Sequence, residues 1–304
     1  MCFICKRLSF FIAGQDTFIH MKKSLNCRGK LLDLSTPAIM GILNITPDSF
    51  YDGGQITGVD SALRLAESML IEGALILDIG GQSTRPGAKS INSTEEWKRI
   101  GPSLISIKKH FPDAIISIDT FHSEVAKNAV EEGASIINDI SAGDFDNKMF
   151  SFVLNSQTPF IMMHMKGSPE NMQENPQYEN VVSEVLNYFI NKVSHLKMMG
   201  LNDIIIDPGF GFGKTIENNY SLLKNLSLFQ ILECPILTGI SRKSMITKTL
   251  NITPAEALNG TTALNTIALL NGASILRVHD VAEAIEVNKL VCAYQKVNDN
   301  NNLF

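Results

Sequence analysis

Three short apolar segments of the sequence each end in a side chain that can accept several hydrogen bonds. Asp119 follows AIISI, Asn138 follows SII, and Asp207 follows DIII. A carboxylate pairs with the amino edge of a pyrimidine at two points, much as it pairs with a guanidinium. These side chains are therefore candidates for holding a flat heterocycle that carries several N–H groups.

A second set of candidates is cationic or can be protonated. Arg85, Arg277 and His279 are suited to a phosphate or a diphosphate. Lys243 can donate a hydrogen bond to a carbonyl oxygen between the two sets. Together the residue types indicate a polar small molecule that joins a heterocycle to a diphosphate.

Residues so far apart in the chain need a scaffold that brings them together. Short apolar runs recur, each followed by a polar loop and a segment of helical period. We predict strands at 38–44, 74–78, 114–119, 135–138, 159–163, 203–207, 235–238 and 274–277. We predict helices at 59–72, 94–110, 123–132, 178–200, 216–229 and 254–271.

The order of these elements predicts the fold. Nearly continuous apolar strands indicate a parallel sheet that helices cover. Eight strand-and-helix units in this length fit a single α/β domain, a (β/α)₈ TIM barrel, better than a doubly wound sheet. In such barrels the site lies at the C-terminal ends of the strands, where the candidate residues above fall.

Composition excludes several other classes. Apolar residues make up 44% of the 304 residues and charged residues 19%, with a net charge of −5. The sequence contains no basic run that would indicate nucleic-acid binding and no apolar stretch long enough to span a membrane. The 5 cysteines are odd in number and scattered, which favours a reducing compartment, so we expect a cytoplasmic protein.

The two ends of the chain differ from the rest. We predict that residues 1–22 form a disordered extension, or a segment upstream of an alternative start near Met21. We predict the barrel at residues 23–298 and a flexible polar tail at residues 299–304.

One motif resembles a phosphate-binding loop but does not satisfy its pattern. Residues 209–215 read GFGFGKT, whereas a Walker A loop needs a glycine at position 208, which is proline. Lys214 is then no phosphate ligand by this criterion, and it could simply follow a turn.

Three other residues could have a structural role instead of a role in the site. Asp78 could anchor a loop as readily as contact a ligand. His164 fits a hydrogen-bonded residue of the barrel rim better than a catalyst, and His122 fits the start of a helix.

Seven motifs in order carry a family resemblance. They are GILNITPDSFYDGG at 41–54, DIGGQSTRPG at 78–87, SIDT at 117–120, INDI at 137–140, DPGFGFGK at 207–214, SRKS at 241–244 and RVHD at 277–280. Over residues 27–293 the chain closely resembles the bacterial dihydropteroate synthase family. The resemblance implies a transferase that joins 4-aminobenzoate to 6-hydroxymethyl-7,8-dihydropterin diphosphate, releases diphosphate and forms 7,8-dihydropteroate for folate synthesis. It also implies a Mg²⁺ cofactor, these two small molecules as partners, and a homodimer.

The resemblance implies the role of each site residue. The pterin would be held by Asp119, Asn138, Met163, Asp207, Phe212 and Lys243. The diphosphate would be held by Asn44, Thr84, Arg85, Arg277 and His279, with Asn44 also placing the metal. The 4-aminobenzoate pocket would be formed by Phe50, Pro86, Lys243 and Ser244. Lys243, Asp119 and Arg85 would act in catalysis, along a dissociative path in which diphosphate leaves first.

Two positions depart from the family pattern. Gln82 stands where glutamate is usual, and Tyr51 where serine is common. The first change removes a charge beside Thr84 and Arg85, but neither change removes a ligand named above.

Two alternatives share the barrel. A pterin-dependent methyltransferase domain would have no use for a diphosphate site, so the residues STRP at 83–86 and the pair Arg277 and His279 disfavour it. A non-catalytic pterin-binding paralogue would be expected to have lost loop or diphosphate residues, and the sequence keeps them.

Overall fold

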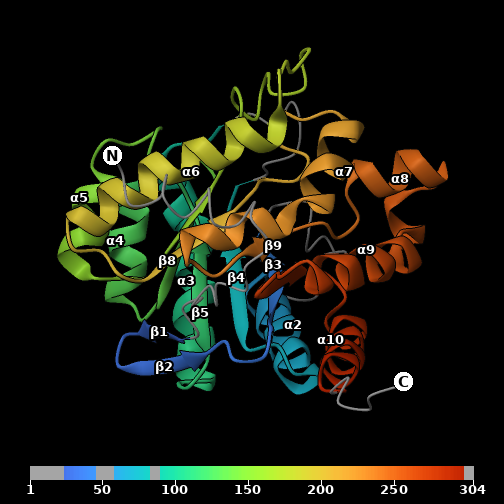
Figure 1. Ribbon diagram of the computed structural model, residues 1–304. Helices are drawn as coiled ribbons and strands as arrows, with labels where there is room; N and C mark the ends of the chain where they lie inside the picture. The colour runs from blue at the N-terminus through green and yellow to red at the C-terminus, as the bar shows by residue number, and fades with distance from the viewer. Residues whose placement is uncertain (1–23, 46–57, 83–89, 298–304) are drawn as a thin grey trace.

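Eight parallel strands surrounded by helices form the body of the molecule (Figure 1). The computed structural model describes residues 24–45, 58–82 and 90–297. The neighbouring strands are, in order, β8, β7, β6, β5, β4, β3, β10 and β9. A parallel bridge between Ile206 and Ile236 joins the two outer strands of this series, so the sheet closes into the predicted barrel.

The elements have the following bounds. The barrel strands are β3 (Ala38–Asn44), β4 (Ile76–Gly80), β5 (Ile115–Asp119), β6 (Ile136–Asp139), β7 (Phe160–Met163), β8 (Ile204–Asp207), β9 (Leu237–Thr238) and β10 (Ile275–Val278). The α-helices are α2 (Gly58–Glu72), α3 (Ser93–His110), α4 (Ser123–Glu131), α5 (Met149–Ser156), α6 (Val181–Met198), α7 (Ile216–Lys224), α8 (Ser244–Leu250), α9 (Leu258–Leu270) and α10 (Val281–Gln295). Two 3₁₀ helices are η1 (Leu226–Leu232) and η2 (Pro254–Glu256).

The predicted strands all occur, and the differences from prediction lie mainly in the helices. The segment predicted as one helix at 216–229 divides into α7 and η1, and the segment at 254–271 divides into η2 and α9. Asn225 ends α7, where its side-chain Nδ2 donates to the carbonyl oxygen of Ser221 at 2.8 Å. Helices α5, α8 and α10 were not among the predicted segments.

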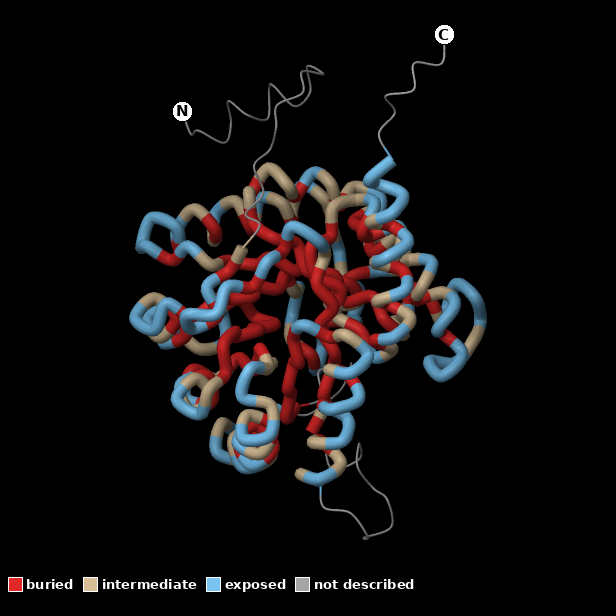
Figure 2. Tube along the Cα trace, turned by 90° about the horizontal axis from the view of Figure 1, so that it is seen from below, coloured by how far each residue is buried: buried red, intermediate tan, exposed pale blue. Residues whose placement is uncertain are grey.

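The barrel interior is closed by a layer of apolar side chains near the N-terminal ends of the strands. Each of the eight strands contributes to it, with Ala38 and Met40 from β3 and one residue from each of the others: Ile76, Ile115, Ile136, Ile161, Ile205, Leu237 and Ile275. A larger apolar core lies between the strands and the surrounding helices. Figure 2 shows the buried segments gathered inside a ring of helices whose outward faces are exposed.

A hairpin that was not predicted covers the lower end of the barrel. Strands β1 (Ser24–Cys27) and β2 (Lys30–Asp33) pair antiparallel around a two-residue turn (Figure 1). Leu25, Cys27 and Leu32 are buried against the interior layer. The hairpin therefore seals the end of the barrel opposite to the C-terminal ends of the strands.

Strand periodicity places the polar candidates at the open end. Side chains on one face of a strand recur every second residue. Two residues beyond the apolar layer, the inward positions include Asp78, Asn138, Asp207 and Arg277, and a further step along β5 reaches Asp119. The geometry of the strands therefore brings these side chains together at the open end of the barrel, which we call the barrel mouth.

Two further observations bear on the predictions. No helix in the described part of the chain has the length and apolar character needed to cross a membrane. The predicted extension at residues 1–22 and tail at residues 299–304 lie outside the described residues, and the domain limits remain predictions.

Candidate active site

A buried network of charged side chains occupies the centre of the barrel mouth. Arg277 Nε donates to Asp78 Oδ2 at 2.6 Å, and Arg277 Nη2 donates to Asp119 Oδ2 at 2.8 Å. Asn138 Nδ2 donates to the same Asp78 oxygen at 3.1 Å. The side chain of Asp78 is fully buried and that of Asp119 is 11% exposed, so a ligand at the mouth would meet Asp119 before Asp78.

The environment shifts the proton equilibria of this network. Burial raises the pKa of Asp119 to about 7, although Arg277 opposes the shift. Burial acts to lower the pKa of Arg277, but Asp78 and Asp119 outweigh it and the pKa is raised. Arg277 is therefore a fixed cation, whereas Asp119 can change charge near neutral pH.

Asp207 and Lys243 are two further charged residues of the site, and each shifts the pKa of the other. Burial raises the pKa of Asp207, and Lys243 acts in the opposite direction. Burial lowers the pKa of Lys243 to about 8, with Asp207 opposing this shift and Arg277 adding to it. Asp207 Oδ1 also accepts a hydrogen bond from the backbone N–H of Gly209 at 2.8 Å, which fixes the carboxylate at the end of β8.

Lys243 lies against the loop that follows β8. Its Nζ donates to the backbone carbonyl of Phe210 and lies 4.6 Å from the centre of the Phe212 ring. This distance is typical of a cation above an aromatic face. Lys243 is thus held between a carbonyl and an aromatic ring, and Ser244 follows it as an exposed residue at the start of α8.

Apolar side chains line one side of the mouth. Met163 is 3% exposed and packs with Phe121 and Ile140, and the partly buried Phe212 packs against this cluster. A flat ring could lie on such a surface with its polar edge toward Asn138 and Asp207. The structure thus brings together six of the predicted residues: Asp119, Asn138, Met163, Asp207, Phe212 and Lys243.

His279 lies beside the loop between β9 and α8. Ser241 Oγ is 3.0 Å from His279 Nδ1, and Arg242 forms an ion pair with Asp280. These contacts fasten the loop carrying Lys243 to the loop that follows β10. His279 itself is exposed.

Four predicted residues, Phe50, Thr84, Arg85 and Pro86, lie outside the described residues. Gln82 and Ile91 are described residues on either side of positions 83–89. Gln82 Oε1 accepts a hydrogen bond from the N–H of Ile91 at 3.2 Å, and His122 Nε2 lies 3.0 Å from the Ile91 carbonyl oxygen. Gln82 therefore contacts Ile91 through an oxygen that glutamate would also supply.

The sequence interpretation did not single out one buried acid near the site. Glu96 is 2% exposed and its Oε2 accepts from Thr120 Oγ1 at 2.8 Å. Burial raises the pKa of Glu96 to about 8. Its position four residues before Ile100 and eight before Leu104 was the available signal, because this spacing puts the acid on the apolar face of the helix, where it needs a partner.

His164 is a packed residue of the barrel rim, as predicted, but the predicted hydrogen bond is wrong for its Nδ1, which is buried without a hydrogen-bond partner. It is 7% exposed, and its ring meets Tyr188 edge-on with ring centres 4.9 Å apart. Burial lowers the pKa of His164 far below its usual range, and the nearby Lys214 acts in the same direction. The ring is therefore neutral and packs as an aromatic residue.

Comparison with known proteins identifies the class first. Residues 40–279 match the family described as pterin binding enzyme. Together with the barrel and its polar mouth, this match places the chain among the pterin-binding barrel enzymes.

Sequence identity to individual relatives identifies the family within this class. The chain is 42% identical to dihydropteroate synthase of Escherichia coli over 91% of this chain and 98% of that protein. It is 44% identical to the Haemophilus influenzae enzyme of the same name over 88% and 97%. The chain therefore belongs to the dihydropteroate synthase family.

Solved structures give the same result. Dihydropteroate synthase of Xanthomonas albilineans with 4-aminobenzoic acid has a TM-score of 0.85 at 37% identity, covering 91% of this chain and 99% of that one. The same enzyme in complex with 7,8-dihydropteroate has a TM-score of 0.82 at 35% identity, covering 90% and 100%. A Yersinia pestis dihydropteroate synthase in a sulfonamide drug complex has a TM-score of 0.85 at 40% identity, covering 90% and 100%.

Proposed function

We propose that this chain condenses 6-hydroxymethyl-7,8-dihydropterin diphosphate with 4-aminobenzoate to give 7,8-dihydropteroate and diphosphate. The observation that carries the proposal is the convergence of Asp119, Asn138, Asp207 and Lys243 around the apolar surface of Met163 and Phe212. This arrangement offers both a polar edge and a stacking face to a pterin, in a chain of the dihydropteroate synthase family.

The pterin would lie with its ring on Met163 and Phe212. Asn138 and Asp207 would receive its amino and N–H groups, and the Lys243 ammonium would donate to its carbonyl oxygen. Asp119 would face the side of the ring nearest the reacting methylene. The 2.8 Å contact of Asp119 with Arg277 would keep this carboxylate oriented.

The leaving diphosphate would lie above the charged network. Asn44 ends β3 at the mouth, and His279 is exposed just after β10. Thr84 and Arg85, which lie outside the described residues, would complete the set. Arg277 would add positive charge from below while remaining bound to Asp78 and Asp119. Cationic and donor groups in these positions stabilise the charge that develops on a departing diphosphate.

Asn44 would be the protein ligand of Mg²⁺. The described residues contain no cluster of three His, Cys, Asp or Glu side chains that could hold a metal ion. Mg²⁺ keeps several waters and binds substrate phosphates, so the diphosphate and water would supply most of its ligands and the Asn44 amide oxygen one more. When bound, the ion would neutralise charge on the diphosphate.

The 4-aminobenzoate would enter beside Lys243. Ser244 is exposed at the start of α8, and Phe50 and Pro86 would complete this pocket. The bond between the methylene carbon and the diphosphate oxygen would break first, leaving a cation delocalised over the pterin. The amine nitrogen would then form the new C–N bond and lose one proton to water. An aryl amine is already unprotonated at neutral pH, so the site needs no strong base.

Diphosphate release tests the proposal directly. Purified protein would be supplied with the pterin diphosphate and Mg²⁺, with and without 4-aminobenzoate. Release that requires 4-aminobenzoate and falls at least about a hundredfold in Lys243→Ala and Asp119→Asn is expected from loss of transition-state contacts. Lys127→Ala, on the exposed surface of α4, is the matched control for removing a charge. Tight pterin binding without release would instead support a non-catalytic paralogue.

We also propose a homodimer that works in the cytoplasm. Exposed apolar side chains on the last two helices support the dimer: Ile267, Leu270, Leu290 and Tyr294. Cys27 and Cys292 form no disulfide in the described part of the chain, which is compatible with a reducing compartment. Sedimentation of wild type and Leu290→Glu tests the dimer, and a wild type that remains monomeric at micromolar concentration would contradict it.

A further inference from the structure

The loop after β8 carries the GFGFGK motif that fails the Walker A pattern. In the structure this loop packs its backbone against the loop after β7. A Cβ atom at Gly209 would overlap the carbonyl oxygen of His164, and one at Gly213 would overlap the carbonyl oxygen of Lys166. Both glycines also have positive φ angles, +72° and +61°. The motif thus allows two backbones to touch, which places carbonyl oxygens close together.

Lys214 fills the space between these two loops. Its Nζ donates to three backbone carbonyls, those of His164 at 3.1 Å, Gly209 at 2.9 Å and Phe212 at 3.0 Å. The residue is only 3% exposed. An ammonium has three N–H donors and no acceptor, so its hydrogen-bonding capacity is fully used by main chain. None of the three partners is a side chain, and the contacts therefore fix backbone position.

The loop that Lys214 holds forms one wall of the pterin site. Its Phe210 carbonyl accepts from Lys243, and its Phe212 ring lies 4.6 Å from Lys243 Nζ. Gly211 N–H donates to Asn219 Oδ1 at 2.7 Å, which anchors the opposite side of the loop. A shift of the loop would therefore move the stacking face and the lysine together.

We propose that Lys214 is a positioning residue for pterin binding, acting through the loop at 209–213 rather than by touching the substrate. The inference rests on the proposed function for the identity of the ligand. Its physical basis is independent of that function, because the three carbonyl contacts exist without any ligand.

The charged groups around Lys214 are compatible with this role. Burial lowers the pKa of Lys214 to about 7, and Lys243 adds to this shift, whereas Asp207 opposes it. Loss of one proton would leave two donors for three carbonyls. The hydrogen bonds of Lys214 are therefore expected to hold the loop most strongly when the side chain is charged, because only the ammonium form has one donor for each of the three carbonyls.

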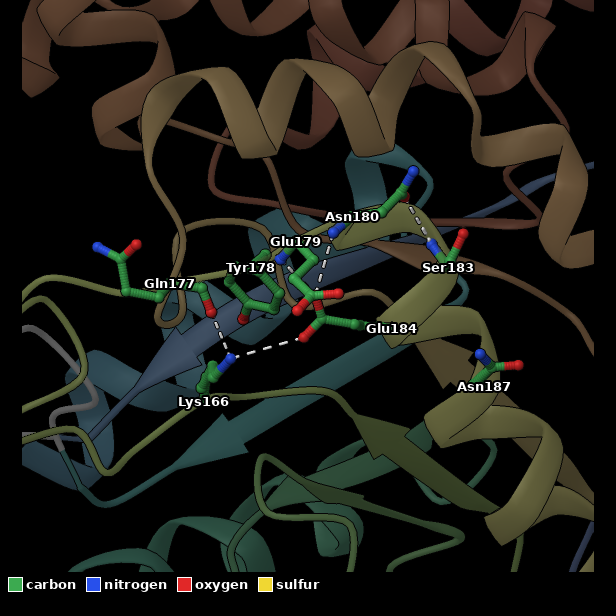
Figure 3. A pocket seen from close by; sticks show the side chains of 8 residues that line it. All are labelled: Lys166, Gln177, Tyr178, Glu179, Asn180, Ser183, Glu184 and Asn187. Carbon is green, nitrogen blue, oxygen red and sulfur yellow. Dashed lines mark hydrogen bonds and ion pairs between the residues drawn. The ribbon is translucent and has the colours of Figure 1, made fainter.

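A tyrosine in a neighbouring pocket also holds the loop at 209–213, through a single hydrogen bond. Figure 3 shows Tyr178 beside Lys166 and Glu184 at the start of α6. Lys166 Nζ lies 3.6 Å from Glu184 Oε2, so the charges of this pocket pair with each other. Tyr178, however, donates from its hydroxyl to the Gly213 carbonyl oxygen at 2.9 Å. Tyr178→Phe removes this one tie with little change in shape.

The test compares Lys214→Met with Lys108→Met. Lys108 also donates to two backbone carbonyls, Pro112 at 2.6 Å and Ala114 at 3.1 Å, but it lies at the other end of the barrel. The probe is 6-hydroxymethyl-7,8-dihydropterin, which carries no diphosphate, so that the lost charge does not act on an anion. Its Kd is measured by calorimetry, together with amide hydrogen exchange at residues 209–213 and the melting temperature.

We expect Lys214→Met to raise the Kd about tenfold and to accelerate exchange at 209–213, while Lys108→Met lowers the melting temperature with an unchanged Kd. Tyr178→Phe should raise the Kd about threefold. If Lys214→Met does not fold, the Kd of Tyr178→Phe tests the inference in its place. Unchanged Kd or unchanged exchange in a folded Lys214→Met protein, or an unchanged Kd in Tyr178→Phe, would overturn the inference. Failure of wild type to bind the pterin would instead count against the proposed function.

Discussion

Arg277 Nη2 lies 2.8 Å from Asp119 Oδ2, although 158 residues separate the two in the chain. The same guanidinium contacts Asp78, so one cation serves two buried carboxylates. Breaking a buried ion pair by removing one partner is costly, because the remaining charge keeps its desolvation penalty. This relationship makes Arg277 important for both the stability and the chemistry of the mouth.

Replacing Arg277 with methionine should lower the free energy of unfolding by about 3 kcal/mol or more. Asp78 and Asp119 would then lie buried without their cation. Urea denaturation followed by circular dichroism measures the change. Lys127→Met removes a cation from an exposed pair 4.0 Å from Glu131 and should cost well under about 1 kcal/mol. Equal losses in the two variants would contradict the central role of Arg277.

Pterin affinity should depend on pH in both directions. The proposed pterin contacts use ionised Asp119, whose pKa burial raises, and protonated Lys243, whose pKa burial lowers to about 8. Affinity should therefore fall at acid pH, as Asp119 becomes protonated, and fall again as pH rises above 8 and Lys243 loses its charge.

Single variants show which residue causes the loss of affinity at low pH (the acid limb) and which causes the loss at high pH (the alkaline limb). Binding of 6-hydroxymethyl-7,8-dihydropterin would be measured by fluorescence titration between pH 5.5 and 9.5. Asp119→Asn should abolish the acid limb and Lys243→Met the alkaline limb. Burial also raises the pKa of Asp207, so Asp207→Asn is measured in parallel. An acid limb that persists in Asp119→Asn but disappears in Asp207→Asn would reassign it.

Gln82 should be replaceable by the glutamate that is usual in the family. Its Oε1 accepts from the Ile91 N–H at 3.2 Å, and a carboxylate oxygen can do the same. We expect steady-state activity of Gln82→Glu within about threefold of wild type, a change of less than about 1 kcal/mol. Gln82→Met lacks the acceptor and should lower stability by about 1 kcal/mol or more. A Gln82→Met protein as stable as wild type would show that this link contributes nothing.

Glu96 should make stability fall with rising pH. Its pKa is raised by burial to about 8 in the folded protein, from a model-compound value of 4.5. A raised pKa means that the folded state binds the proton more tightly, so the contribution is complete below pH 4.5 and is lost as pH rises through 8. Glu96→Gln removes this dependence.

The stability of Glu96→Gln relative to wild type should therefore increase between pH 5 and pH 9. A difference of a few kcal/mol is the upper range for such a shift. Thermal melts at matched ionic strength measure it, with the exposed Glu131→Gln as the control. Parallel curves for wild type and Glu96→Gln across this range would contradict the assignment.

The barrel strands could be predicted because their signal is local. The strand predicted at 38–44 has the same bounds in the structure. An apolar strand that is buried on both sides needs only its own residues to be recognised. The β1–β2 hairpin was missed because its two strands have 4 residues each and bury only Leu25, Cys27 and Leu32. Such short strands exist only because the barrel end covers Leu25 and Leu32.

Helix ends were harder to predict because tertiary packing decides them. Residues 226–232 continue the helical pattern of α7, yet they form a 3₁₀ helix with Leu226, Phe229 and Leu232 buried in the core between strands and helices. A tighter turn places all three side chains against that core. The pattern of apolar residues did not distinguish this 3₁₀ turn from a continued α-helix.

The sequence by itself determined the barrel, the end of the barrel that holds polar residues and the family, since strand period and motif order are properties of the chain. Only the tertiary structure decided the partners of these residues. It joined Arg277 to Asp78 across 199 positions and gave Lys214 three carbonyls from two loops. Side-chain pairing depends on distances between strands and loops, and those distances exist only once the sheet has closed.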